Sequence, residues 1–333
     1  MLDQWNMMNR VMISVPDKKI AVLTRDCAGV NATVRSLVRT ANKYNIGVLG
    51  FLKGYDGLID NKFIKLDRRS VSGIINQGGT ILKTARSKRF FIESEQKKAV
   101  QNIKDNKVQG LIVIGGDGSL RGAHILASKY NIPVVGIPAT IDNDVNGVDL
   151  SIGADTAVNV ALDALDKIRD TATSLERIFV VEVMGRECGY IALQVALARG
   201  CEEVLIPEKD FNIDAMCEEI KTGSSKGKES WIIIVAEGKA KGHDIANLIT
   251  EKTNLETRVV VLGHIQRGGH PTSIDRIMAA RLGNYAVNVL KDGVTDHCVS
   301  LKDGKLVTIP LEVAVQPKKT DVNTYYKLIK ILT

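Results

Sequence analysis

Short apolar runs alternate along most of the chain with longer segments whose apolar residues recur at helical spacing. The short runs predict buried strands at residues 20–24, 46–52, 111–114, 133–137, 177–183, 204–206, 231–236 and 258–262. The periodic segments predict helices from about residue 30 to 41 and at 70–77, 95–104, 119–130, 156–169, 189–198, 213–221, 244–253 and 272–290. Residues 53–67 are expected to form an irregular or hairpin connection. Strands that alternate with helices predict an α/β fold whose mostly parallel sheets carry helices on both faces.

The length of 333 residues favours about two compact lobes over one domain. We expect two doubly wound, Rossmann-like lobes. The first spans residues 18–138 with part of the C-terminal region, and the second spans 139–310, with the chain crossing back near the C-terminus. Residues 1–17 are expected to be an N-terminal extension.

Composition excludes several classes of protein. No apolar run approaches the roughly 18 residues that a membrane span needs, and the first residues lack the apolar core of a secretory signal, so we expect a cytoplasmic protein without a membrane partner. The net charge is +7, but Lys and Arg form no single basic tract and no nucleic-acid motif is present. The five cysteines lack CxxC spacing, which favours reduced structural thiols.

The first informative strand end follows residues 111–114. The strand runs into Gly-Gly-Asp-Gly-Ser (115–119), whose glycines let backbone N–H groups approach a ligand closely. A helix beginning near Ser119 would direct its positive end at the same place, which suits phosphate. Asp117 would repel phosphate there unless Mg²⁺ lies between them, and this cation prefers oxygen ligands. The stretch therefore predicts a site for phosphate and magnesium.

The next strand end carries Pro-Ala-Thr-Ile-Asp-Asn-Asp (138–144), which presents Asp142 and Asp144 beside Thr140. One carboxylate can accept a proton from an attacking hydroxyl while the other helps to hold metal or water. Taken alone, each stretch is also explained as a glycine turn or a polar loop, because short glycine motifs are common. Together they lie at successive strand ends of one β–α–β unit, where open sheets bind ligands. The pair favours phosphoryl transfer.

These motifs, with Val-Glu-Val-Met-Gly-Arg (181–186) and Leu-Gly-His-Ile-Gln-Arg-Gly-Gly (262–269), resemble those of the 6-phosphofructokinases. The resemblance is strongest to the short bacterial, ATP-dependent type and extends from about residue 19 to about 318. It implies a glycolytic enzyme that phosphorylates fructose 6-phosphate at O1 with Mg·ATP and assembles as a homotetramer. The lobe at 18–138 would bind the nucleotide, and the lobe at 139–310 the sugar phosphate.

The resemblance also implies roles for individual residues. Asp142 would be the general base, Asp117 the Mg²⁺ ligand, and Asp144 a neighbour at the metal site or an orienting group. Arg186 would stabilise charge on the transferring phosphoryl group. The nucleotide-binding positions are Arg25, Arg86, Gly116, Asp117, Gly118, Ser119 and Gly122. The sugar phosphate would contact Thr140, Met184, Gly185, Glu237, His264 and Arg267, with Arg177 and Arg258 reaching in from a neighbouring subunit.

A second anion site is implied between subunits, for ADP or phosphoenolpyruvate as an effector. Within the helix that begins near residue 30, Arg35 and Arg39 lie one turn apart, a like-charge pair that is unfavourable unless an anion neutralises it. Two solvated arginines explain this pair equally well. The resemblance assigns this site Arg35, Arg39, Arg68, Arg169, Lys226 and Lys228, with Glu202 as the carboxylate on the metal side of bound ADP.

The donor half of the presumed site departs from the family pattern. The loop Thr24-Arg25-Asp26-Cys27-Ala28-Gly29 is about two residues shorter than usual and lacks the glycine pair and proline that lie against the ATP phosphates. Arg25 would either supply charge to a phosphate or block it. Phe91 stands where an arginine that contacts ATP is usual. Gly118 matches the ATP type. Ala139 stands at a position where the ATP type has glycine and the pyrophosphate type has lysine.

Three hypotheses follow. The intact acidic and arginine positions favour an active ATP-dependent enzyme. The shortened loop favours a weakly active or non-catalytic regulatory subunit that binds sugar phosphate and effector. A pyrophosphate-dependent enzyme is disfavoured by Gly118 and Ala139 but kept open by the same loop.

Overall fold

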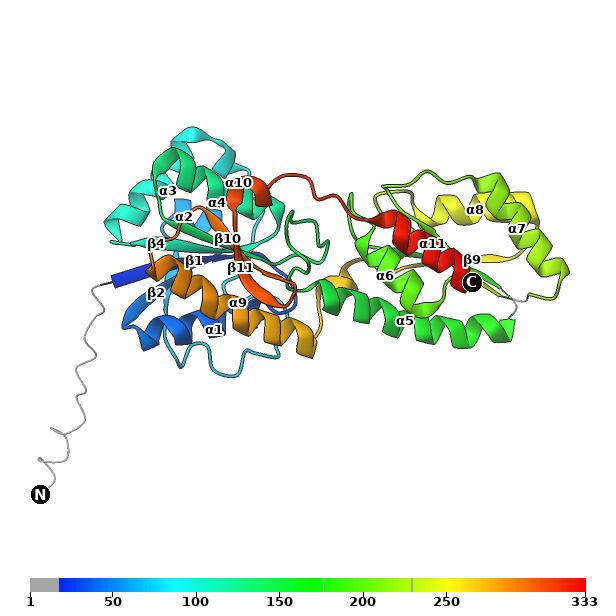
Figure 1. Cartoon of the computed structure of the whole chain (residues 1–333), viewed down its shortest axis with the longest axis horizontal. Helices are drawn as coiled ribbons and strands as arrows, with labels where there is room; N and C mark the ends of the chain where they lie inside the picture. Colours follow the sequence, from blue (N-terminus) through cyan, green and yellow to red (C-terminus); the bar gives the residue numbers. More distant parts are fainter. Residues whose placement is uncertain (1–17, 176, 229) are drawn as a thin grey trace, which may run out of the picture.

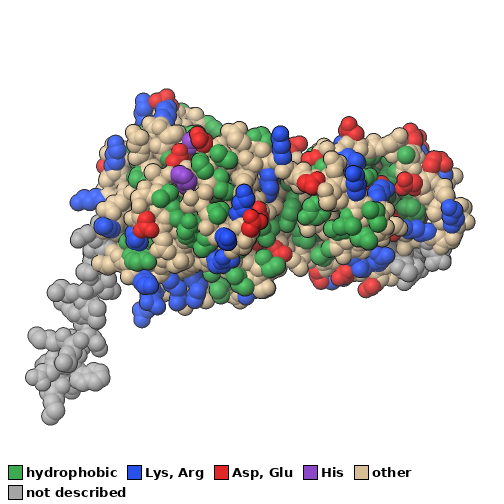
Figure 2. Space-filling view, viewed as in Figure 1, with side chains coloured by type: hydrophobic (Ala, Val, Ile, Leu, Met, Phe, Trp, Pro, Cys, Tyr) green, Lys and Arg blue, Asp and Glu red, His purple; other side chains and the backbone are tan. Residues whose placement is uncertain are grey.

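The computed structural model describes residues 18–333 except 176 and 229, so the predicted extension at 1–17 lies outside the described residues. Two lobes lie side by side (Figure 1), with a narrower waist between them (Figure 2). The first lobe is built on a seven-stranded sheet of order β11-β10-β5-β4-β1-β2-β3. Five of its strands run parallel, namely β1 (Lys18–Thr24), β2 (Ile46–Phe51), β4 (Gly110–Gly115), β5 (Val134–Pro138) and β10 (His297–Lys302). The edge strands β3 (Phe63–Leu66) and β11 (Lys305–Pro310) pair antiparallel with their neighbours.

Helices cover both faces of this sheet because its strands are apolar on both sides. Val22 and Ile112 face one core, while Leu23 and Leu111 face the other, as expected when successive side chains alternate across a strand. One face carries α1 (Val30–Lys43) and α9 (Ser273–Lys291). The other carries α2 (Tyr55–Ile59), α3 (Glu93–Asp105), α4 (Asp117–Tyr130) and α10 (Leu311–Ala314).

The second lobe contains a smaller, wholly parallel sheet of order β7-β8-β6-β9. Its strands are β6 (Ile178–Val183), β7 (Glu203–Leu205), β8 (Trp231–Ala236) and β9 (Thr257–Val261). Helices α5 (Ala154–Leu175), α6 (Tyr190–Arg199) and α11 (Val322–Leu332) lie on one face, and α7 (Ile213–Ser225) and α8 (Gly242–Thr253) on the other. The predicted α/β architecture with mostly parallel sheets is confirmed.

Several local predictions need correction. The helix predicted at 70–77 is wrong: the segment forms turns, and Gly73 adopts a positive φ of 71° that interrupts helical geometry. The strands β10 and β11 fall inside the range 139–310 assigned to the second lobe, yet they belong to the first sheet. Their hairpin and helix α11 were not predicted.

The surface adds little to the choice of function. On the face in view, Lys and Arg side chains are spread over both lobes with Asp and Glu among them (Figure 2). None of the helices within the described ranges combines the length and apolarity needed to cross a membrane.

Candidate active site

The carboxyl ends of β1, β4 and β5 open into a cavity of about 480 Å³. This volume is within the range of small-molecule sites. Two arginines from the second lobe, Arg186 and Arg267, complete its wall. The cavity thus brings together eleven of the residues predicted from the sequence: Arg25, Arg86, Gly116, Asp117, Gly118, Ser119, Thr140, Asp142, Asp144, Arg186 and Arg267.

One end of the cavity is formed by the N-terminus of α4, which begins at Asp117. A Cβ atom at Gly116 would lie 3.0 Å from the Cβ of Thr140, whereas one at Gly118 would meet no atom within 4 Å. The open space at Gly118 leaves room for a ligand beside the positive end of the helix dipole, as phosphate requires. Gly122 does not line the cavity. A side chain there would collide with the Tyr55 ring, 2.6 Å away, so this glycine serves helix packing.

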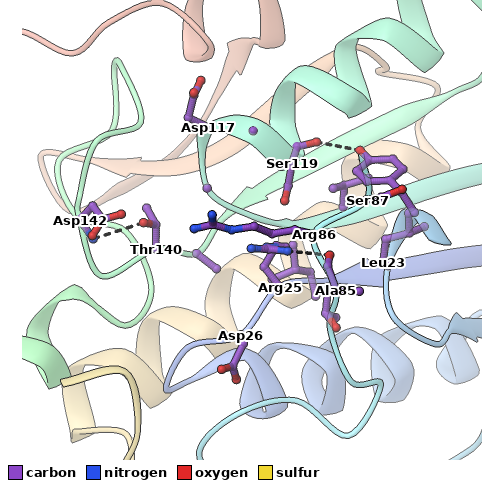
Figure 3. A pocket seen from close by; sticks show the side chains of 18 of the residues that line it. Leu23, Arg25, Asp26, Ala85, Arg86, Ser87, Asp117, Ser119, Thr140 and Asp142 are labelled. Carbon is purple, nitrogen blue, oxygen red and sulfur yellow. Dashed lines mark hydrogen bonds between the residues drawn. The ribbon is translucent and has the colours of Figure 1, made fainter. Parts of the chain in front are cut away.

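Asp142 is the most buried carboxylate of the cavity, with 2% of its surface exposed. Its Oδ2 lies 3.4 Å from Nε of Arg186, and its Oδ1 is buried without a hydrogen-bond partner among the described residues. The Asp142 N–H donates to Oγ1 of Thr140 at 3.2 Å (Figure 3). Burial raises the pKa of Asp142, and the opposing effects of Arg186 and Arg267 do not cancel this shift. The side chain is therefore more basic than an ordinary aspartate.

Asp144 and Asp117 lie at the same cavity. Oδ1 of Asp144 is buried and unpaired within the described chain, and burial, followed by repulsion from Asp142 and Asp117, raises its pKa to about 6. Asp117 accepts a hydrogen bond from Nε of Arg121 at 2.9 Å. Unpaired buried oxygens are suitable ligands for Mg²⁺. The described residues contain no group of three His, Cys, Asp or Glu side chains arranged to hold a metal alone, so further oxygens would come from phosphate and water.

The segment after β6 positions Arg186 through a strained turn. Gly185 has φ 147°, and a Cβ atom there would lie 2.4 Å from the carbonyl oxygen of Cys188. Arg186 itself has φ 51°, which is unfavourable for a residue with a side chain and is maintained by its surroundings. Oε1 of Glu237, at the end of β8, accepts from the Arg186 N–H at 3.1 Å. This contact places Glu237, which was predicted to contact the sugar phosphate, beside the turn that carries Arg186.

A second contact at this turn was missed in the sequence. Oε1 of Gln266, in the short helix η2 (Gly263–Arg267), accepts from the Met184 N–H at 2.8 Å. Gln266 lies inside the motif at 262–269, between His264 and Arg267. This position could have indicated from the sequence that Gln266 belongs to the site. His264 is exposed on the same short helix. Met184, Gly185, Glu237 and His264 do not line the cavity in the isolated chain.

The arginines predicted to act in a neighbouring subunit also lie away from the cavity. Arg177 precedes β6, at the opposite end of the strand from Arg186. Its Nε lies 2.9 Å from Oε2 of Glu256, and Arg258 contacts the same carboxylate. Within one chain, this pair therefore cannot contact a ligand held at Asp142.

The shortened loop places a cation in the cavity. Nη1 of Arg25 donates to the carbonyl oxygen of Ala85 at 2.7 Å, while Arg86 points towards Thr140 and Asp142 (Figure 3). Burial lowers the pKa of Arg25, and Arg86, Arg186 and Arg267 lower it further. Like charges gathered in this way are relieved by an anionic ligand. Several residues that line the cavity were not predicted, including Asp26, Tyr55, Ser87 and Lys88.

The predicted effector residues form two separate groups. Arg35 and Arg39 lie on α1 of the first lobe, and the Nε of Arg39 is buried without a partner in the described part of the chain. In the second lobe, Nζ of Lys228 lies 3.1 Å from Oε1 of Glu202. Figure 1 shows α1 and α7 far apart. A single chain therefore does not complete the proposed effector site, whose remaining members are Arg68, Arg169 and Lys226.

Comparison with known proteins decides the family. The model of the phosphofructokinase family matches residues 19–290. The chain belongs to the phosphofructokinase family. The family membership that its motifs indicated is confirmed.

Similar proteins cover nearly the whole chain. It is 45% identical over 318 residues to the ATP-dependent 6-phosphofructokinase of Thermotoga neapolitana, covering 95% of this chain and 100% of that one. Identity to the protein of the same name from Bacillus subtilis is 48%, covering 95% and 99% of the two chains. The structure of phosphofructokinase from Saccharomyces cerevisiae matches with a TM-score of 0.83 and 33% identity, covering 90% of this chain. This chain spans only 45% of that longer yeast chain.

A pyrophosphate-dependent phosphofructokinase from Marinobacter aquaeolei shares the fold. The TM-score is 0.80 at 22% identity, covering 92% of this chain and 86% of that one.

Proposed function

We propose that the cavity transfers the γ-phosphoryl group of ATP to the O1 hydroxyl of fructose 6-phosphate, forming ADP and fructose 1,6-bisphosphate. The observation that carries this proposal is the buried, partly unpaired Asp142 facing Arg186 beside the N-terminus of α4. The chain is an ATP-dependent kinase of glycolysis, in keeping with near-full-length relatives named for that activity.

The nucleotide phosphates would lie between the N-terminus of α4 and the arginines of the first lobe. The N–H groups at the start of α4 supply donors, and the open space at Gly118 allows close approach. Arg25 and Arg86 line the same cavity and would supply positive charge. In this arrangement Arg25 partly replaces the missing glycine pair of the shortened loop.

A magnesium ion fits the acidic side of the cavity. Asp117 and Asp144 are the residues that would hold it, because both line the cavity and Asp144 carries an unpaired buried oxygen. Such an ion, when bound, would neutralise negative charge on the nucleotide phosphates. The hydrogen bond from Arg121 would then orient the Asp117 carboxylate, because carboxylates that ligate metals are commonly hydrogen-bonded to outer partners.

Asp142 acts as the general base. As O1 attacks the γ-phosphorus, its proton passes to Oδ1 of Asp142, and the bond to the bridging oxygen of ADP breaks. The raised pKa of Asp142 makes it a better proton acceptor than an exposed aspartate. Arg186, next to Asp142, stabilises the negative charge on the transferring group. Thr140 orients the turn that presents Asp142.

The second lobe would bind the sugar phosphate, with the first lobe binding the nucleotide. Met184 and Gly185, in the turn after β6, and Glu237, which contacts this turn, would face the sugar. His264 and Arg267 would hold its 6-phosphate. Arg177 and Arg258, which lie far from their own cavity, would contribute to the cavity of an adjacent subunit in a homotetramer. We also expect a cytoplasmic location.

An effector site at the subunit boundary would join the two separated groups of cations. Arg35, Arg39 and Arg68 of one subunit would face Arg169, Glu202, Lys226 and Lys228 of another. ADP or phosphoenolpyruvate suits this set, because arginine is well adapted to phosphate. The buried, unpaired Nε of Arg39 is the observation in favour.

The test is a coupled assay of fructose 6-phosphate with ATP, GTP and pyrophosphate in turn. Turnover with ATP is expected, and pyrophosphate should be a poor donor because of Gly118 and Ala139. Activity with pyrophosphate alone would favour the pyrophosphate-dependent enzyme. Absence of turnover with every donor would favour a regulatory subunit.

A further inference from the structure

A segment near the C-terminus joins the two lobes across the loop that follows β5. After α10, the chain leaves the first lobe and runs to α11 on the second (Figure 1). Pro317 in this segment forms an antiparallel bridge with Val145. The Asn146 N–H donates to the carbonyl oxygen of Ala314 at 3.2 Å. The segment therefore pairs directly with the loop that carries Asp142.

Lys318 of this segment binds the loop at two points. Its Nζ donates to the carbonyl oxygen of Asn143 at 3.0 Å and to that of Val148 at 2.7 Å. Asn143 is the residue between the two acidic side chains of the site, Asp142 and Asp144. It is 2% exposed and has φ 51°, in the left-handed region. A cationic donor is thus fixed on the peptide group that joins Asn143 to Asp144, one residue after Asp142.

The side chain of Asn143 holds the other end of the loop. Its Oδ1 accepts from the Ser151 N–H at 2.9 Å, and its Nδ2 donates to the carbonyl oxygen of Asp149 at 3.2 Å. With Lys318 on the main-chain carbonyl, Asn143 is restrained through both its backbone and its side chain. Small rotations of this residue would change the directions of the neighbouring carboxylates.

We propose that Lys318 is a positioning residue for phosphoryl transfer: through the carbonyl of Asn143 it fixes the orientation of Asp142 and Asp144 relative to the second lobe. This inference rests on the proposed role of Asp142 as the base. Lys318 acts through Asn143 and touches neither the substrate nor the reacting atoms.

Packing alone does not require a lysine at this place. Burial lowers the pKa of Lys318, with opposing effects from Cys188, Asp144 and Asp149, so the ammonium group is partly removed from water. Such a group is unfavourable unless it is hydrogen-bonded, and an apolar side chain of similar volume is often at least as stable. The two carbonyl contacts therefore indicate a geometric role.

The segment is anchored on the second lobe as well. Within α11, the Tyr326 hydroxyl donates to Oε1 of Glu203 at 3.0 Å, and Nζ of Lys330 lies 2.6 Å from Oε2 of the same residue. Glu203 begins β7 of the second sheet, the sheet whose β6 leads to Arg186. Lys318 thus lies on a segment that is hydrogen-bonded to the loop of the base and continues into α11 on the lobe that supplies its arginine.

The experiment compares Lys318→Met, Lys318→Arg and the control Lys319→Met, which alters an exposed neighbour. For each full-length protein, kcat and the KM values for fructose 6-phosphate and ATP are measured, and the number of active sites is counted by calorimetric titration with ATP. Lys318→Met should lower kcat per site by about 10²-fold, as expected for a misplaced catalytic group, with both KM values nearly unchanged. Lys318→Arg retains cationic donors, so its kcat per site should be at least about tenfold higher than that of Lys318→Met. Lys319→Met should resemble the wild type.

The outcomes separate this inference from the proposed function. If the wild-type chain turns over and Asp142→Asn does not, an unchanged kcat per site in Lys318→Met overturns the positioning role alone. An equal loss in the arginine variant, or a loss that appears only as fewer active sites, also overturns it. If Lys318→Met does not fold, Lys318→Gln, whose polar side chain is one atom shorter, replaces it with the same expected loss. An inactive wild type with every donor overturns the proposed function itself.

Discussion

Nε of Arg186 lies 3.4 Å from Oδ2 of Asp142, across the boundary between the two lobes. Asp142 follows β5 of the first sheet, whereas Arg186 follows β6 of the second. The contact therefore depends on how the lobes are docked. The second oxygen of Asp142 has no partner among the described residues, which leaves it available to a substrate hydroxyl.

Replacing Asp142 by Asn should remove the proton acceptor while preserving the shape of the site. We expect kcat to fall by about 10²–10⁴-fold, with fructose 6-phosphate binding nearly unchanged. Steady-state kinetics and calorimetry measure the two quantities. Asp163→Asn, at an exposed ion pair with Lys167, is the matched control. A change confined to the KM for fructose 6-phosphate would exclude a role as base.

Asp144 should make the stability of the metal-free protein depend on pH. Its pKa rises from 3.8 to about 6 on folding, so its contribution to the free energy of unfolding is largest below pH 3.8 and is lost as pH rises through 6. Asp144→Asn removes this destabilisation, on the order of 3 kcal/mol at pH 8 and about half of that at pH 5. Denaturant unfolding in the presence of a chelator measures it. A gain that does not depend on pH would contradict the predicted shift, as would an equal gain in Asp163→Asn.

Arg25 should contribute directly to nucleotide binding. One lost charge-assisted hydrogen bond is worth about 1.5–3 kcal/mol, so Arg25→Met should weaken Mg·ATP binding by roughly 10- to 150-fold. Calorimetric titration measures this affinity. Arg281→Met is the control, because Arg281 also donates to a backbone carbonyl, that of Gly304, outside the cavity. Tighter ATP binding by Arg25→Met would mean that this side chain obstructs the phosphates.

Phe91 should interact with the adenine base. It lines the cavity and is 84% exposed, which is unusual for a large apolar ring and leaves its face free for stacking. Base–aromatic stacking contributes about 1–3 kcal/mol, so Phe91→Ala should weaken ATP binding by roughly 5- to 150-fold.

Binding of inorganic triphosphate, which has no base, provides the discriminating measurement for Phe91. It should be unaffected in Phe91→Ala, and Ile92→Ala, at a neighbour that is 54% exposed, should change neither ligand. Equal losses of affinity for ATP and for triphosphate would mean that Phe91 maintains the conformation of its loop and does not stack on the base.

Subunit mixing should reveal shared active sites. Arg177→Ala and Arg258→Ala should each weaken fructose 6-phosphate binding, since both arginines lie away from their own cavity. Mixing either protein with Arg186→Ala should partly restore activity, because some hybrid sites regain every arginine. A fully active monomer in analytical ultracentrifugation would contradict both the sharing and the tetramer.

Sequence patterns predicted the features that depend on local periodicity. The strands β4 and β5 and the acidic ends that follow them were identified because a buried strand is apolar throughout and ends in polar residues. The prediction of a helix at 70–77 was wrong because it relied on the apolar spacing and gave too little weight to Gly73, which interrupts helical geometry. Lys318 gave no signal, since a lysine near the C-terminus resembles any solvated charge until the chain is folded back across Asn143. The Asp142–Arg186 contact likewise depends on lobe docking, which periodicity does not report.

Phosphoryl transfer to O1 of the sugar is measured most directly by ³¹P NMR of the purified chain with Mg·ATP and fructose 6-phosphate. A phosphate ester on O1 of the sugar should appear at the same rate as ADP. In Asp142→Asn, both signals should grow more slowly by about 10²-fold or more. Formation of ADP with inorganic phosphate and no sugar ester, or an ester on another hydroxyl, would contradict transfer to O1 with Asp142 as the base.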